Sequence, residues 1–256
     1  MRPRLAAVAA FAGTLLYAVA VLTPFGQHVE NSLMRGYADQ ARVMSVLYTV
    51  GPPPLKWEWP TLLIGVSAVV VIAAVRRAWG IGLRASAAVT LSVGTVELMH
   101  GVLPRPDISD APWTSTAASF PSGHVAIVAG LGLGLVAVSS ARARPWVSAL
   151  VCLWLSLTGA AVLALHWHRP SDVLGACLVA IFWSAILVPV TGHRPLPRRA
   201  GAALVGTWVI AAVLASSRSD SVARPLVFAA VAVVAAGLYW FGLSGPPGTG
   251  RRARSS

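Results

Sequence analysis

The sequence predicts an all-α integral membrane protein with eight membrane-spanning helices. The first observation is composition: the chain of 256 residues is 56% hydrophobic and only 11% charged, whereas soluble domains carry about 25% charged residues. The second is the length of the apolar runs, because a helix needs about 20 apolar residues to cross a bilayer. Since lipid offers no backbone hydrogen bonds, these runs are expected to be helices packed on one another.

The expected spans follow the apolar runs along the chain, and the second run is the shortest. Ala18-Val19-Ala20 in the first run resembles a signal-peptide cleavage site. That run is long for a signal peptide, so an uncleaved anchor is favoured. The eight expected spans are residues 5–25, 60–75, 82–103, 124–141, 146–166, 172–191, 200–217 and 224–243.

Basic residues indicate the orientation of these spans. With the N-terminus in the cytoplasm, most of the 20 basic residues fall in the inner segments, as the positive-inside rule expects. Both termini are then cytoplasmic. The net charge of +12 is therefore a topology signal. The arginines form small clusters in separate loops and not one basic face, so no nucleic-acid partner is expected.

The outer segment after the first span predicts an amphipathic helix lying along the membrane surface. Trp57 and Trp59 follow it and fit an interfacial aromatic belt before the second span. Two interpretations stay open: a helix that packs over the bundle, or a guide for lipid headgroups. The apolar residues at three- and four-residue steps are Val29, Leu33, Tyr37, Ala41, Met44 and Tyr48.

Two short polar motifs interrupt the apolar sequence at expected membrane surfaces. The first polar motif is residues 120–124 (Phe-Pro-Ser-Gly-His), and the second is residues 168–172 (His-Arg-Pro-Ser-Asp). Each ends a loop and begins a span. Two spans separate them, and two helices return the chain to the same side. We therefore expect both motifs at the outer surface.

The first polar motif has the features of an anion site. Ser122 is a favoured helix N-cap, and Gly123 lets a ligand approach the backbone closely. The free N–H groups at a helix start attract anions. The alternative is a capped helix with a buried histidine at 124.

The second polar motif places His168 and Asp172 four residues apart. If helical geometry begins near His168, the two side chains lie on one face. A carboxylate that holds one ring N–H leaves the other nitrogen free to attack. Arg105, in the preceding outer loop, can clamp a phosphate with two hydrogen bonds, although such an arginine is also found solvated or bound to lipid headgroups.

These motifs together resemble the type 2 phosphatidic acid phosphatase family. The resemblance rests on Pro121-Ser122-Gly123-His124, on His168-x-x-x-Asp172 about 40 residues later and on Arg105-Pro106 before them. It covers roughly residues 60–192. It implies an integral membrane lipid phosphate phosphatase with a six-helix core, related to vanadium haloperoxidases. The expected organisation is a core at 1–192, then two additional helices and a basic tail at 193–256.

The resemblance also implies residue roles. His168 would attack phosphorus, Asp172 would orient it, and His124 would protonate the leaving alcohol and then activate water. Arg105, Ser122 and backbone N–H groups near Gly123 would hold the phosphate oxygens. The family needs neither metal nor cofactor. Cys152 and Cys177 fall inside spans, as small buried residues do.

Two departures from the family pattern concern positive charge. The family's lysine, seven residues before the motif arginine, is Leu98 here, and its second arginine, six residues before the nucleophile, is Val162. The only lysine, Lys56, is far away in sequence. We hypothesise that His100 and Arg169 replace the missing cations as phosphate ligands.

The sequence therefore predicts a phosphatase for a lipid phosphomonoester or diphosphate at the outer leaflet. The expected partners are membrane lipids and a substrate such as phosphatidic acid, phosphatidylglycerol phosphate or a polyprenyl phosphate. Two alternatives stay open because of the missing cations: a degenerate member that binds or moves lipid phosphates, and a phosphotransferase to a lipid or sugar acceptor. The oligomeric state has no sequence signal.

Overall fold

The computed structural model describes residues 1–34, 49, 51, 53–109, 117–189, 205–213 and 223–244, and helices are its only regular secondary structure there. A further short helical stretch covers 205–213. The main helices are α1 (Pro3–Val21), α2 (Pro24–Met34), α4 (Glu58–Val75), α5 (Trp79–Val102), α6 (Gly123–Val138), α7 (Arg144–Ala164), α8 (Pro170–Leu187) and α10 (Ala223–Ser244).

Most of the expected spans coincide with these helices. In the described residues, α1, α4, α5, α7 and α8 are long and apolar enough to cross a membrane, and α6 and Leu226–Trp240 are shorter apolar helices. The short second run is helix α4. Of the expected span at 200–217, residues 205–213 are helical, and the rest of that range lies outside the described residues. The protein therefore has the features of a multi-pass membrane protein.

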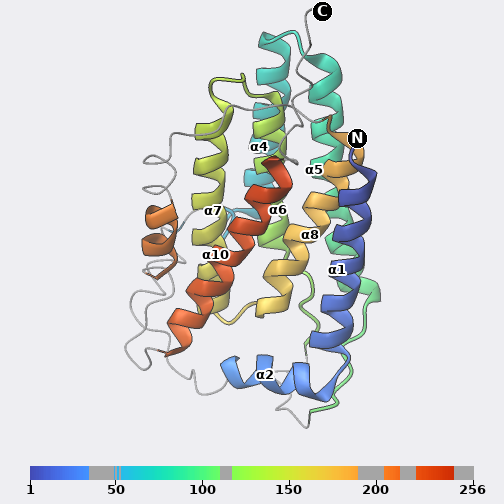
Figure 1. The fold of residues 1–256 in the computed structure, drawn as a ribbon, viewed down its shortest axis with the longest axis vertical. Helices are drawn as coiled ribbons and strands as arrows, with labels where there is room; N and C mark the ends of the chain where they lie inside the picture. Colours follow the sequence, from blue (N-terminus) through green and yellow to red (C-terminus); the bar gives the residue numbers. More distant parts are fainter. Residues whose placement is uncertain are drawn as a thin grey trace, which may run out of the picture.

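The long helices run side by side in one bundle, and α2 lies across one end of it (Figure 1). Helix α1 packs on α8, α5 on α6, and α10 on α7. Helices α6 and α8 are apolar on most sides and largely buried, as expected for the centre of such a bundle.

Arginines connect the helix ends at the opposite end from α2. The backbone N–H of Arg2 donates to the Ala185 carbonyl at 2.7 Å, and its guanidinium donates to the Gly242 carbonyl. The guanidinium of Arg76 donates to the Val138 carbonyl. The last carbonyls of a helix lack partners within it, and these arginines satisfy some of them. The two polar motifs, at the starts of α6 and α8, therefore both lie at the end of the bundle that α2 crosses. This confirms that the two motifs lie at the same end of the bundle.

Helix α2 differs from the expected surface helix. It begins at Pro24, earlier than expected, and residues 35–48 of the expected helix lie outside the described part of the chain. Glu30 and Asn31 are buried, whereas Phe25 is 76% exposed. The polar face turns into the end of the bundle because its side chains find hydrogen-bonding partners there, described below.

The last helix is part of the bundle core. Phe228 and Tyr239 of α10 are fully buried, and the Tyr239 hydroxyl donates to the Ala129 carbonyl of α6 at 2.8 Å. This contact joins α10 to the centre of the bundle. The division of the chain at residues 192 and 193 stays a prediction.

Candidate active site

The end of α7 positions the second polar motif. His166 has a positive φ of 59°, a conformation that histidine adopts more readily than most residues. The backbone N–H groups of Trp167 and His168 both donate to the Val162 carbonyl, at 3.1 and 3.3 Å. This compact helix end reverses the chain direction and holds His168 just before α8.

His168 and Asp172 are brought together, but not by sharing a helix face. Helix α8 begins at Pro170, so His168 precedes it. Asp172, in the first turn, reaches back: its Oδ2 lies 3.4 Å from His168 Nδ1 and accepts the Arg169 backbone N–H at 2.8 Å. The fully buried carboxylate thus caps its own helix and contacts the ring nitrogen at once.

Ser119 connects three of the expected site residues. Its carbonyl lies 3.2 Å from His168 Nδ1 and 3.1 Å from His100 Nε2. Its hydroxyl accepts a hydrogen bond from Arg169 Nη1 at 2.6 Å. The sequence contained no signal for this role, because a backbone carbonyl can come from any residue type.

The first polar motif begins α6, as expected. Ser122 is the N-cap, and its hydroxyl accepts the Val125 N–H at 3.4 Å. The Ser122 backbone N–H donates to the Asp172 carbonyl at 3.0 Å, which ties the two motifs together. A Cβ on Gly123 would lie 3.3 Å from Glu97 Oε1, so glycine leaves room at this helix start.

His124 lies beside the second motif and has a carboxylate partner that the sequence did not indicate. Its ring centroid is 5.8 Å from that of His168 and 5.2 Å from that of Trp167. Its Nε2 is 2.8 Å from Glu58 Oε1. Glu58 is the first residue of α4, which is distant in sequence from both motifs.

A cavity of about 460 Å³ opens beside His124. It includes Lys56, which the sequence placed far from the motifs. Although Lys56 is distant from the motifs in sequence, the packing of α4 against α6 brings the segment before α4 to the site. The lining residues are Leu55, Lys56, Trp57, Glu58, Trp59, Pro60, His124 and Trp167.

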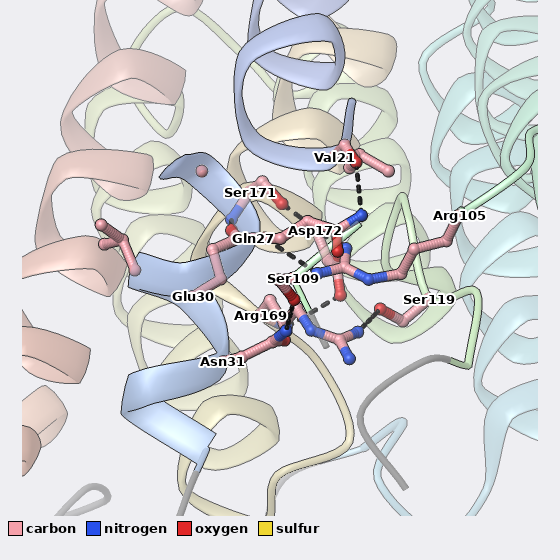
Figure 2. A network of polar contacts seen from close by, with 12 residues as sticks. Val21, Gln27, Glu30, Asn31, Arg105, Ser109, Ser119, Arg169, Ser171 and Asp172 are labelled. Carbon is pink, nitrogen blue, oxygen red and sulfur yellow. Dashed lines mark hydrogen bonds and ion pairs between the residues drawn. The ribbon is translucent and has the colours of Figure 1, made fainter. Parts of the chain in front are cut away.

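Arg105 belongs to a buried network with α2 and the start of α8. Its Nη2 lies 3.7 Å from Glu30 Oε2, and both side chains are less than 10% exposed. Glu30 Oε1 accepts the Ser171 backbone N–H at 2.9 Å. Figure 2 shows Glu30 reaching from α2 toward Arg105 and Ser171. Glu30 was not expected to contribute to the site, and its helix was expected either to pack over the bundle or to guide lipid headgroups.

Burial and neighbouring charge govern protonation in this network. Burial, helped by the nearby Asp172, raises the pKa of Glu30, while the hydrogen bonds from Ser171 and the charge of Arg105 oppose the rise. Burial also lowers the pKa of Arg169, and the proximity of Arg105 adds to this. Two arginines and two carboxylates therefore lie close enough to affect one another's charge, and Asp172 links them to His168.

A comparison with protein families matches the part of the chain that contains both polar motifs. Residues 80–195, which include α6, α7, α8 and almost all of α5, match the PAP2 superfamily. Residues 80–195 are a PAP2 superfamily domain. This membership implies phosphatase-like activity. No curated relative and no solved structure matches the chain.

Leu98 and Val162 stand where the family resemblance implies two cations. Leu98 is 64% exposed on α5, and Val162 is fully buried in the core. The cations hypothesised to replace them, His100 and Arg169, both reach Ser119. Within the part of the chain that the structure describes, no three histidine, cysteine or acidic side chains are grouped to hold a metal ion.

Proposed function

We propose that this protein is a metal-independent membrane phosphatase that hydrolyses a lipid phosphomonoester or diphosphate at the outer face through a phosphohistidine. One observation carries the proposal. Two histidine rings lie 5.8 Å apart, one at the start of α6 and the other against a buried carboxylate. This arrangement offers a nucleophile and an acid to opposite sides of one phosphoryl group.

In the first step, the Nε2 lone pair of His168 attacks phosphorus. The bond between phosphorus and the leaving oxygen breaks, and that oxygen keeps the bonding electrons and takes a proton from His124. Asp172 stabilises the positive charge that develops on the His168 ring, because its Oδ2 lies 3.4 Å from Nδ1. The products of this step are the free alcohol and phosphohistidine; a diphosphate releases a phosphate ester instead of the alcohol.

In the second step, water attacks the phosphorus of the phosphohistidine. His124, now neutral, takes a proton from the water, and the phosphorus–nitrogen bond breaks with its electrons returning to His168. Inorganic phosphate leaves, and both histidines are restored. The start of α6, with Ser122 and the backbone near Gly123, supports the phosphate oxygens. Arg105, Arg169 and His100 complete the proposed set of phosphate ligands.

A second cavity supports a lipid substrate. A cavity of about 310 Å³ lies between α1, α5 and α8 and is lined mostly by apolar side chains, among them Met99, Leu103 and Phe182. Tyr17 also lines it, and the Tyr17 ring packs on Phe120 of the first polar motif with centroids 5.2 Å apart. A hydrocarbon chain in this cavity would therefore lie next to the proposed site.

The decisive experiment compares wild type with His168→Ala in detergent, using a panel of lipid phosphates in the presence of a metal chelator. We expect wild type to release phosphate and to form an acid-labile phosphoenzyme, and the variant to do neither. Equal release from both proteins, or none from either with every substrate, would refute the phosphatase. Tight lipid-phosphate binding without release would favour the non-hydrolytic alternative, which the apolar Leu98 and Val162 motivate.

A further inference from the structure

The general acid proposed for the site has a carboxylate partner outside the matched domain. Glu58 precedes residues 80–195, so the PAP2 match contains no counterpart of it. Its Oε1 lies 2.8 Å from His124 Nε2, a hydrogen-bonding distance. The side chain of His124 is only 14% exposed, whereas that of Glu58 is 46% exposed. A partly exposed carboxylate thus holds a mostly buried ring.

The position of this pair relative to the cavity indicates what it does. Both side chains line the cavity of about 460 Å³ at the start of α4. In the proposed reaction, His124 gives its proton to the leaving oxygen, so the leaving group must lie next to His124. This cavity adjoins His124, so it leaves room for a ligand oxygen beside the ring that Glu58 contacts.

We propose that Glu58 is the positioning residue of His124, the general acid of the proposed reaction. The inference rests on the proposed function. Glu58 orients the ring through Nε2 and stabilises the imidazolium that must be present when the leaving oxygen needs a proton. The site then contains two histidine–carboxylate pairs, one for the nucleophile and one for the acid.

Other charged groups near the pair do not take this role. Glu97 and His100 of α5 and His168 act on Glu58 through their charge, and Lys56 lines the same cavity. Glu97 approaches the α6 backbone at Gly123, whereas the carboxylate at hydrogen-bonding distance from the His124 ring is that of Glu58. Glu97→Gln is therefore a matched control that removes a nearby carboxylate and leaves the contact between Glu58 and His124 intact.

The test measures how activity depends on the leaving group. A nitrophenyl phosphate has an acidic leaving group that needs little protonation, whereas an alkyl lipid phosphate needs a full proton. We expect Glu58→Gln to lower kcat for the alkyl substrate by about 10- to 100-fold. The same variant should keep the nitrophenyl rate within about threefold, and KM should change little for either substrate. Glu58→Asp should restore part of the alkyl activity, and Glu97→Gln should keep the wild-type dependence.

The remaining outcomes separate this inference from the proposed function. If wild type shows no His168-dependent release, the proposed function fails and Glu58 loses its role with it. If wild type is active but Glu58→Gln slows both substrates equally, or neither, the positioning role is refuted and the phosphatase stands. A lowered unfolding temperature with equal losses on both substrates would show that Glu58 is structural only. An inactive Glu58→Asp with an intact fold would also contradict the inference.

Discussion

Asp172 serves two neighbours with one carboxylate oxygen. Its Oδ2 caps α8 by accepting the Arg169 backbone N–H, and the same oxygen contacts His168 Nδ1. The helix start favours the charged form at this place, and so do the hydrogen bonds. A residue that the helix needs for capping is thereby held at the distance that catalysis needs.

Asp172→Asn separates these two duties. The amide oxygen can still accept the Arg169 N–H, so the cap survives and stability should fall by less than about 2 kcal/mol. The neutral amide no longer stabilises a charged His168 or fixes its tautomer, so kcat should fall by about 100-fold or more. Phosphate release and thermal unfolding measure the two effects. Activity within threefold of wild type would contradict the assigned role.

Glu30 makes stability depend on pH in a definite direction. Burial raises its pKa in the folded protein, so the unfolded chain loses this proton first as pH rises. The free energy of unfolding therefore falls as pH increases from the ordinary carboxyl pKa, about 4.3, through the raised folded pKa. Glu30→Gln keeps an acceptor for the Ser171 N–H but does not titrate. We expect the unfolding temperature of wild type to fall relative to this variant over that window; a constant difference would disprove the effect.

At the scale of the elements, close packing against α8 holds the loop that ends in the first polar motif. Gly175 lies against the buried ring of Phe120, and a Cβ there would come within 2.6 Å of a ring carbon. The same loop continues into Ser122, whose backbone binds the Asp172 carbonyl. A glycine on one helix therefore controls how closely the start of another can approach.

Gly175→Ala tests this packing, with Gly94→Ala as its matched control. The added methyl group must displace the Phe120 ring, which should lower stability by about 1–3 kcal/mol and reduce phosphate release by shifting the first motif. Gly94 is also inside a helix but has no atom within 4 Å of a new Cβ, so its variant should keep both properties. Equal behaviour of the two variants in thermal unfolding and activity would show that the Phe120 contact is not critical.

For the whole molecule, the arginines at one end and the polar motifs at the other agree with one orientation. The helix ends near Arg2 and Arg76 lie opposite α2, and the positive-inside rule places such arginines in the cytoplasm. The site then faces outward. This placement is a proposal, and it can be tested without any assay of activity.

Labelling of single cysteines in intact cells tests the orientation. The native Cys152 and Cys177 are fully buried and should give little background. Asp107→Cys, in the loop after α5, should react with a membrane-impermeant maleimide, whereas Ala141→Cys, between α6 and α7, should react only after the cells are permeabilised. Both positions are exposed in the structure. The reverse pattern would place the site in the cytoplasm.

The sequence predicted the membrane-spanning helices. The apolar runs that became α5, α6, α7 and α8 are visible because a bilayer requires about 20 apolar residues. Because two of these spans separate the two polar motifs, the sequence also predicted that both motifs lie at the same end of the bundle. The N-cap at Ser122 and the proximity of His168 to Asp172 were also predicted, because both are local: each depends on residues within one helical turn.

Only the tertiary structure decided what surrounds these residues. Glu58 beside His124, Glu30 beside Arg105 and Lys56 in the cavity come from segments distant in sequence, and no periodicity marks such contacts. The reason is physical: each apolar segment gains free energy by itself when it moves from water into lipid, so its own sequence is enough to identify it as a span. A partner for a buried charge is specified by which helices pack together. The sequence by itself determined a membrane bundle with a histidine–aspartate pair, and the packing of α2 and α4 decided the charges around it.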